Sequence, residues 1–409
     1  GGAQAAALAQ NRIGNSRLEW ESTTVTNFGV DAGFLNNRLT AELDVYNKVT
    51  DGILTTPNLH LTMGIKTPPT MNTAEVTNRG FELTVGLKDH VGDFNYAVST
   101  NFSYNHNEVT KYLGKYEAGW VEKDGKKVWQ SNIGDVSVDK DKGRIVEGHP
   151  IKEYYTLNTY SGNGTHFNSD GSVNINGGPK DGMIRTEGDM KWLNAMIDAG
   201  YKFMPNQSVG RNNIYYGDLI YADLNGDGIY GSSYDYDFQG SSAMPKFGYG
   251  INISASWKNF DLSMLWAGNG GFKLYWEEDP YNSVAIRNGF ATSERVANDH
   301  YFYDPENPTD SRTNLNGYIP RLVENSKQSR QTSNYYLYNG TYMKLKNLTI
   351  GYTLPVTLKE KISAERVRVY LSGENLFTIT SFPGQDPEMG ATTNYPSLRQ
   401  FAAGISVTF

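Results

Sequence analysis

The chain has no cysteine among its 409 residues. Disulfide scaffolds, thiolate metal sites and cysteine nucleophiles are therefore excluded. Charged side chains make up only 20% of the sequence, below the roughly 25% usual in globular domains. The net charge of −7 gives no basic excess, so nucleic acid is not expected as a partner. No apolar run approaches the roughly 18 residues that a membrane helix needs, so a spanning helix is not expected either.

Glycine and aromatic residues are abundant instead, with 43 Gly, 28 Tyr, 17 Phe and 7 Trp. Apolar residues alternate with mostly polar ones between Arg38 and Tyr46, where the apolar set is Leu39, Ala41, Leu43 and Val45. A period of two is typical of half-buried strands and not of helices. The same alternation recurs in the segments Asp93–Asn105, Phe247–Trp257, Val367–Ser372 and Phe401–Phe409.

Two folds give this alternation: a soluble antiparallel sandwich and a transmembrane β-barrel. The strands predicted at Leu18–Phe34, Arg38–Thr55 and Tyr342–Leu354 exceed the five or six residues typical of globular strands. Their polar positions often carry Ser, Asn, Gly or Thr, which suits a water-filled interior, and aromatic residues lie near many strand ends. These features favour an all-β fold, an antiparallel transmembrane β-barrel.

The lengths of the expected connections support the barrel. Short connections at 35–37, 88–93, 258–259 and 355–365 alternate with long ones at 57–73, 114–149, 277–333 and 381–396. Outer-membrane barrels have short periplasmic turns and long outer loops, so we expect the C-terminus at Phe409 to face the periplasm. The predicted organisation is an outer loop at 1–17, four strands in 18–113, a long loop region at 114–243, a hairpin at 244–276, an outer loop at 277–333 and three last strands in 334–409.

The number of strands depends on the segment 151–240. Ile151–Tyr160 and Tyr216–Ala222 are either two further strands, giving about eleven, or parts of an outer loop, giving nine. Both counts are odd, whereas single-chain bacterial barrels have an even number. We therefore expect this chain to be the C-terminal part of a larger barrel.

Seven segments, in order along the chain, resemble the SusC-like family of TonB-dependent outer-membrane transporters of the Bacteroidetes. They are Leu18–Glu21, Leu43–Leu54, Asn78–Leu83, Gly217–Gly228, Tyr342–Pro355, Gly373–Thr380 and Pro383–Glu388. The resemblance implies a 22-stranded barrel closed by an N-terminal plug, with neither the plug nor the first barrel half in this chain. The alternating Phe401, Ile405, Val407 and Phe409 resemble the C-terminal signal read by the barrel-assembly machinery.

The same resemblance implies a function in the outer membrane of the bacterial cell, where the wall contacts lipid. The family imports oligosaccharides, or oligopeptides in some relatives, with energy from the TonB complex and with a SusD-like surface lipoprotein as a lid. Two alternatives stay open: a passive porin-like barrel, and a secreted β-rich glycan-binding protein or hydrolase.

One motif resembles the first half of a calcium loop. Asp223, Asn225, Asp227 and the carbonyl of Ile229 occupy the ligand positions, and Gly228 occupies the turn position. The bidentate Glu expected at position 12 is replaced by Tyr234. Calcium is therefore one interpretation, and an Asx/Gly-rich turn is the other.

No enzyme is predicted. The carboxylates of 277–279, Asp304 and Glu306 lie in polar loops, the six His have no ligand spacing, and no GxSxG occurs.

Within Tyr342–Leu354 the apolar residues change from odd to even positions at Lys346–Asn347, which predicts a β-bulge there. Loop aromatics can contact sugars, or they can anchor and pack the loops. The candidates for substrate contact are Trp120, Trp129, Trp192, Tyr275 and Trp276.

Overall fold

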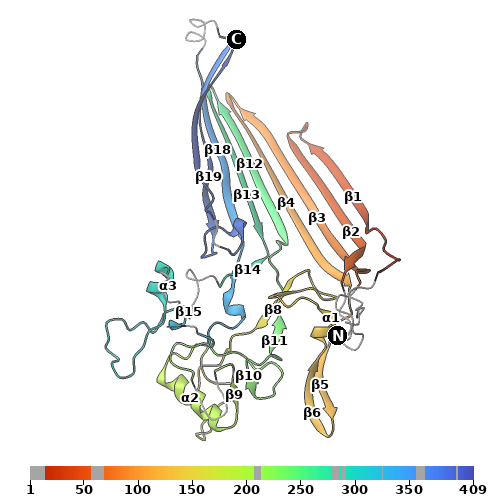
Figure 1. Ribbon diagram of the computed structural model, residues 1–409. Helices are drawn as coiled ribbons and strands as arrows, with labels where there is room; N and C mark the ends of the chain where they lie inside the picture. The colour runs from red at the N-terminus through yellow and green to blue at the C-terminus, as the bar shows by residue number, and fades with distance from the viewer. Residues whose placement is uncertain are drawn as a thin grey trace, which may run out of the picture.

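The computed structural model describes residues 14–56, 69–206, 213–277, 285–286, 292–324, 326–355, 364–392 and 395–409. Its main element is one antiparallel sheet of nine strands, which curves through space (Figure 1). No helix within these ranges is long and apolar enough to cross a membrane. In spatial order the strands are β1 (Ser22–Phe34), β2 (Leu39–Thr55), β3 (Met71–Val91), β4 (Phe94–Lys111), β12 (Phe247–Trp257), β13 (Phe260–Gly270), β18 (Tyr342–Thr353), β19 (Arg366–Thr380) and β20 (Gln400–Thr408).

The alternation along each strand becomes two chemically different faces of the sheet. Residues that pair across an antiparallel ladder lie on the same face. Leu43 pairs with Leu83, which pairs with Phe102, which pairs with Tyr249. This apolar row therefore crosses β2, β3, β4 and β12 on one side of the sheet, here called the apolar face. The other side is called the polar face.

Short and long connections lie at opposite ends of the sheet, as predicted. The described turns at 35–38, 92–93 and 258–259 lie at the same end as the C-terminus, whereas the segments 112–246 and 271–341 gather at the other end (Figure 1). Residues 57–68 and 356–363, which belong to two further predicted connections, lie outside the described part of the chain. So do residues 1–13 of the outer loop predicted at 1–17.

The β-bulge predicted at Lys346–Asn347 is confirmed. The pairing of β18 with β19 shifts between Leu345 and Asn347, and the pairing of β13 with β18 shifts opposite the same place. One extra residue on β18, relative to β13, therefore keeps the apolar side chains before and after the bulge on the same face.

The higher strand count is corrected to nine within the described residues. The segment Ile151–Tyr160 contains β8 (Glu153–Leu157), but β8 pairs with β7 (Gly143–Arg144) and β11 (Tyr236–Phe238) in a separate small sheet. Tyr216–Ala222 makes only isolated bridges. The physical reason is burial, because all five residues of β8 are buried and a barrel strand with one wet face could not bury them.

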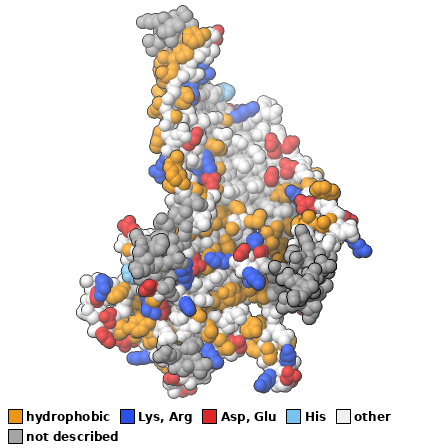
Figure 2. All heavy atoms as spheres, in the orientation of Figure 1, with side chains coloured by type: hydrophobic (Ala, Val, Ile, Leu, Met, Phe, Trp, Pro, Cys, Tyr) orange, Lys and Arg blue, Asp and Glu red, His pale blue; other side chains and the backbone are white. Residues whose placement is uncertain are grey.

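The segments at the long-connection end fold together into what we call the loop assembly, residues 112–206, 213–246, 271–277, 292–324 and 326–341. Hydrophobic side chains are prominent over it in Figure 2, whereas the middle of the sheet shows mainly other side chains. Its helices are α1 (Ile133–Val136), α2 (Glu187–Asp198), α3 (Glu294–Asp299) and the 3₁₀ turn η2 (Asn334–Tyr336). Its further strands are β5 (Ala118–Lys123), β6 (Lys126–Ser131), β9 (Lys202–Phe203), β10 (Ile229–Tyr230), β14 (Lys273–Tyr275), β16 (Val323–Glu324) and β17 (Leu337–Asn339). Two elements lie outside these ranges. Strand β15 (Ala285–Ile286) pairs with β16, and the 3₁₀ turn η4 (Pro387–Met389) follows β19.

Candidate functional site: the polar face and the loop assembly

The polar face carries mainly polar side chains, many of them small and uncharged. Thr40 pairs with Gly86, Gly86 with Ser99, and Ser99 with Asn252, so one polar row runs parallel to the apolar rows. Register places three residues expected on this face there: Thr40, Ser99 and Ser254. It places four residues expected on the apolar face on that side: Leu39, Leu43, Ile251 and Val369.

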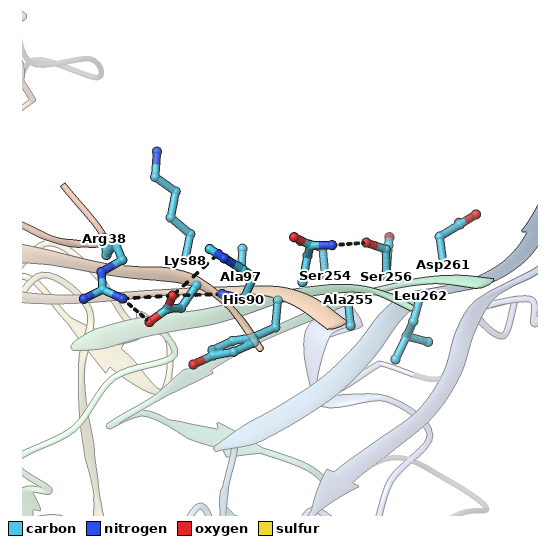
Figure 3. Close-up of a pocket in the computed structure, with 13 residues that line it drawn as sticks. Arg38, Lys88, His90, Ala97, Ser254, Ala255, Ser256, Asp261 and Leu262 are labelled. Carbon is cyan, nitrogen blue, oxygen red and sulfur yellow. Dashed lines mark hydrogen bonds and ion pairs between the residues drawn. The ribbon is translucent and has the colours of Figure 1, made fainter. Parts of the chain in front are cut away.

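A cavity of about 750 Å³ lies against the strands at the short-turn end. Figure 3 shows Lys88, Ser256 and Asp261 on one side of the sheet and Ala255 and Leu262 on the other. The polar side chains are hydroxyls, amides and charged groups that water or a polar solute can contact. This side of the sheet therefore suits a hydrated passage and not a dry protein core.

An ion pair spans three strands on the polar face near that cavity. The Arg368 guanidinium on β19 donates to the Asp261 carboxylate on β13 over 2.5 and 2.9 Å. Gly351 on β18 lies between them, and a Cβ there would come within 2.5 Å of both side chains. A larger residue at this position would have to displace the ion pair, because the ion pair crosses directly over the Gly351 backbone.

The loop assembly is held by aromatic packing. Trp192 on α2 is fully buried, stacks on Tyr160 with ring centroids 5.3 Å apart, and donates from Nε1 to the carbonyl of Asn174 over 2.7 Å. Burial raises the pKa of Tyr160 to about 12. The N-terminus of α2 is fixed by a capping box between Thr186 and Asp189. These contacts give the loop assembly a core of its own.

Asp218 connects two distant parts of the loop assembly. Its fully buried carboxylate accepts two 2.8 Å hydrogen bonds from the Arg321 guanidinium and one from the backbone N–H of Tyr215. Next to it Gly217 has a φ of +84°, and a Cβ there would clash with the Tyr301 ring. The segment 213–222 is therefore tied to residues 301 and 321 by charge and by close packing.

A further contact holds the segment after β19 against the sheet. We call this segment, residues 381–392 and 395–399, the strap. The ammonium of Lys344 on β18 is buried and donates to Asp386 over 2.6 Å and to Glu388 over 2.7 Å. Burial opposes ionisation of the two carboxyls, but the hydrogen bonds from Lys344 prevail and lower the pKa of both. Phe382 packs on Trp276 with centroids 5.5 Å apart.

The calcium motif forms a compact turn. Asp223 accepts backbone N–H bonds from Gly226 and Gly228, over 2.7 and 2.8 Å, and Asp227 accepts one from Ile229 over 2.8 Å. No group of three His, Asp or Glu side chains in the described ranges could hold a metal ion. The fit to calcium is therefore incomplete, because the carboxylates already bond the backbone and no third acidic ligand in the described ranges joins them.

Burial corrects three of the five predicted substrate contacts. Trp192 is 0% exposed, Trp276 5% and Tyr275 9%, so no ring face is open to a ligand. Each packs in an aromatic cluster instead. Trp120 and Trp129 pair across the β5–β6 hairpin, 5.6 Å apart, and Trp120 stays 44% exposed while its Nε1 donates to the carbonyl of Asn225.

The carboxylate Glu277, considered above for hydrolysis, is a structural ion-pair partner. It accepts from Arg330 over 2.8 Å and lies 3.4 Å from the Lys142 ammonium. Glu278 and Asp279 lie outside the described residues. The side chains predicted as an assembly signal are all exposed at or just after β20; they are Phe401, Ile405, Val407 and Phe409.

Sequence reasoning missed a second cavity, of about 580 Å³, inside the loop assembly. It is lined by the neighbouring pair Tyr215 and Tyr216 and by the run Tyr301, Phe302 and Tyr303. Two short aromatic clusters in polar loops were the available signal. Their meeting could not be predicted, because the contact joins segments far apart in the sequence.

The known proteins to which this chain is similar are TonB-dependent receptors. Residues 2–203 match the family model described as TonB dependent receptor-like, beta-barrel. TonB-dependent receptor P3 of Formosa agariphila is 26% identical over 411 residues, covering 97% of this chain and 35% of that protein. TonB-dependent receptor SusC of Bacteroides thetaiotaomicron is 25% identical over 400 residues, covering 97% of this chain and 32% of that protein. The chain thus spans about a third of the length of these relatives.

Solved structures show the same fold. The RagAB peptide importer in its closed-closed state superposes with a TM-score of 0.65 at 22% identity, covering 97% of this chain and 36% of that chain. A long antiparallel sheet with one apolar and one polar face, and with its ordered loops at one end, defines a section of the wall of a β-barrel of the outer-membrane type. The chain is similar over nearly its whole length to TonB-dependent receptors, SusC among them.

Proposed function

We propose that this chain forms part of the barrel of an outer-membrane importer of the SusC type, which takes up oligosaccharides with energy from the TonB complex. The observation that carries the proposal is the division of the nine-stranded sheet into an apolar and a polar face. The apolar face contacts lipid and the polar face lines the path of the solute. The loop assembly forms the outer mouth, and the short turns with the C-terminus lie on the periplasmic side.

The proposed partners are those that the similarity to SusC implies. A SusD-like surface lipoprotein covers the loop assembly as a lid, and the barrel-assembly machinery reads the exposed Phe401, Ile405, Val407 and Phe409. The TonB complex acts through the plug that the resemblance to SusC-like transporters implies for the full-length protein. Calcium at Asp223, Asn225, Asp227 and the Ile229 carbonyl stays a proposal, as does ligand contact by Trp120 and Trp129.

Oligopeptides are the second candidate solute, because the RagAB structures with this fold are described as a peptide importer. That likeness shows the fold alone. The exposed aromatic rings of the loop assembly, among them Trp120, Tyr215 and Tyr318, favour sugars, whose C–H faces pack on such rings.

The test is uptake by cells that carry the full-length protein. Labelled oligosaccharide should enter cells with an intact TonB complex and should not enter cells without TonB. A labelled oligopeptide supplied in parallel should stay outside. TonB-independent entry of small solutes of every kind would indicate a passive porin, and preferential peptide entry would indicate the second solute class.

A further inference from the structure

The cavity between residues 215–216 and 301–303 has walls that are fixed in place. Tyr216 packs on Tyr303 with ring centroids 5.1 Å apart in an edge-to-face arrangement. Tyr301 is 0% exposed and its hydroxyl donates to the carbonyl of Arg185 over 2.6 Å. Because the rings are already ordered, a ligand would bind without paying the entropy of arranging them.

The two guanidinium groups of this cavity are both neutralised by carboxylates. Arg321 is held by Asp218, as described above, and Arg312 donates to Asp310 over 2.7 and 3.0 Å. The hydrogen bonds from Arg312 lower the pKa of Asp310 to about 2, so the pair stays ionised at neutral pH. The cavity therefore offers no unpaired guanidinium to an anionic ligand.

Three uncharged polar side chains line the same cavity. The side chains of Tyr216, Tyr303 and Asn298 form no hydrogen bond with any other residue that the structure describes. Two hydroxyls and one amide next to ring faces can therefore exchange hydrogen bonds with a ligand. A ligand that matches must combine an apolar face with several hydroxyl groups and carry no net charge.

We propose that this cavity binds one neutral sugar residue of the transported solute. The proposal rests on the proposed function, because it names the class of solute that the outer mouth receives first. A ring face of Tyr216 or Tyr303 packs against the C–H face of the sugar, and Asn298 with the tyrosine hydroxyls bonds its hydroxyl groups. A volume of about 580 Å³ lies within the roughly 300–1,000 Å³ range of small-molecule sites.

The test is binding to the purified full-length protein in detergent, measured by saturation-transfer NMR and then by titration. The neutral probes are the methyl glycosides of glucose, galactose, mannose and xylose; the contrasting probes are glucuronate and trialanine. At least one neutral probe should bind. Tyr303→Leu should weaken that binding at least tenfold, whereas Tyr303→Phe, which keeps the ring, should weaken it about two- to tenfold.

Two further variants sharpen the test. Tyr234→Leu is the matched control, since Tyr234 is 48% exposed and lies outside the cavity, so its loss should leave binding unchanged. Asp310→Asn should free Arg312 and make glucuronate bind. The proposal is overturned if no neutral probe gives a signal that depends on Tyr303, or if trialanine or glucuronate binds the unaltered cavity more tightly than every neutral probe.

This binding is measured without TonB and without transport. If the cavity does not bind the neutral probes although TonB-dependent uptake is intact, only the proposed sugar site is contradicted. Loss of uptake in the unaltered protein would contradict the import function and leave the binding result standing.

Discussion

The sheet and the loop assembly follow different physical rules in one chain. Along β12 and β13 no large hydrophobic side chain is buried, and Trp257, Phe260 and Leu265 are 43–52% exposed. In the loop assembly Trp192, Tyr221, Tyr301 and Tyr336 are at most 1% exposed. The loop assembly therefore folds as a soluble domain does, around its own core, whereas the sheet depends on ladder hydrogen bonds and on the solvent at each face.

This difference explains why the loop assembly can be elaborate without weakening the sheet. A strand in lipid must keep every backbone group paired and every second side chain apolar. The loop assembly has no such restriction and can use buried ion pairs such as Asp218–Arg321. Residues of the loop assembly can therefore change while the sheet stays the same.

The largest predicted effect removes the centre of the loop core. Trp192→Ala should cost about 3–5 kcal/mol of loop-assembly stability, because it leaves a cavity where a fully buried ring packed. Limited proteolysis should then cut within 114–243 while circular dichroism still reports the strands of the sheet. Trp120→Ala, at an exposed ring, is the control and should leave the cleavage pattern unchanged. Simultaneous loss of the strand signal would show that the two regions are one cooperative unit.

A somewhat smaller effect is expected from a charge on the apolar face. Ile251→Arg should destabilise the barrel in lipid by about 2–4 kcal/mol if the residue lies at mid-bilayer. Ser254→Arg, three residues along β12 on the polar face, is the matched control and should cost little, because its charge can reach water. The measurement is urea unfolding of the full-length protein in lipid vesicles. Equal costs at the two positions would mean that the two faces do not differ in solvent.

The alternation that underlies this prediction is a local property of each strand. The sequence alone therefore predicts which face each residue lies on, which connections are short or long, and the β-bulge at Lys346. A period of two determines the side of a strand without any knowledge of its partner. Long-range contacts determine the rest. Asp218 meets Arg321, and Tyr216 meets Tyr303, across stretches in which no periodic pattern links them. For the same reason the burial of Trp192 could not be predicted, because its partners Tyr160 and Asn174 lie far from it in the sequence.

The smallest predicted effect concerns the strap, where loop meets sheet. The pKa values of Asp386 and Glu388 are lowered in the folded protein, mainly by Lys344 acting against the effect of burial. Their contribution to strap stability is therefore present above the unfolded pKa values of about 4 and is lost as the pH falls through the lowered values. Hydrogen-exchange protection in 381–392, relative to the sheet, should fall below about pH 4.

Lys344→Met is the control for the strap, because it removes the buried ammonium that both carboxylates share. The variant should show weak protection of 381–392 already at neutral pH and little further change in acid. Protection that is the same in the variant and the original protein would mean that aromatic packing around Phe382 alone holds the strap.

Spin-label accessibility along β12 shows directly whether the two faces of the sheet meet different solvents, because a chain without cysteine allows a single label at each position. Labels at 249, 251 and 253 should be reached by oxygen dissolved in lipid, and labels at 250, 252 and 254 by a water-soluble nickel complex. Accessibility should alternate between lipid and water at every step along the strand. A profile in which neighbouring positions share the same solvent would contradict it.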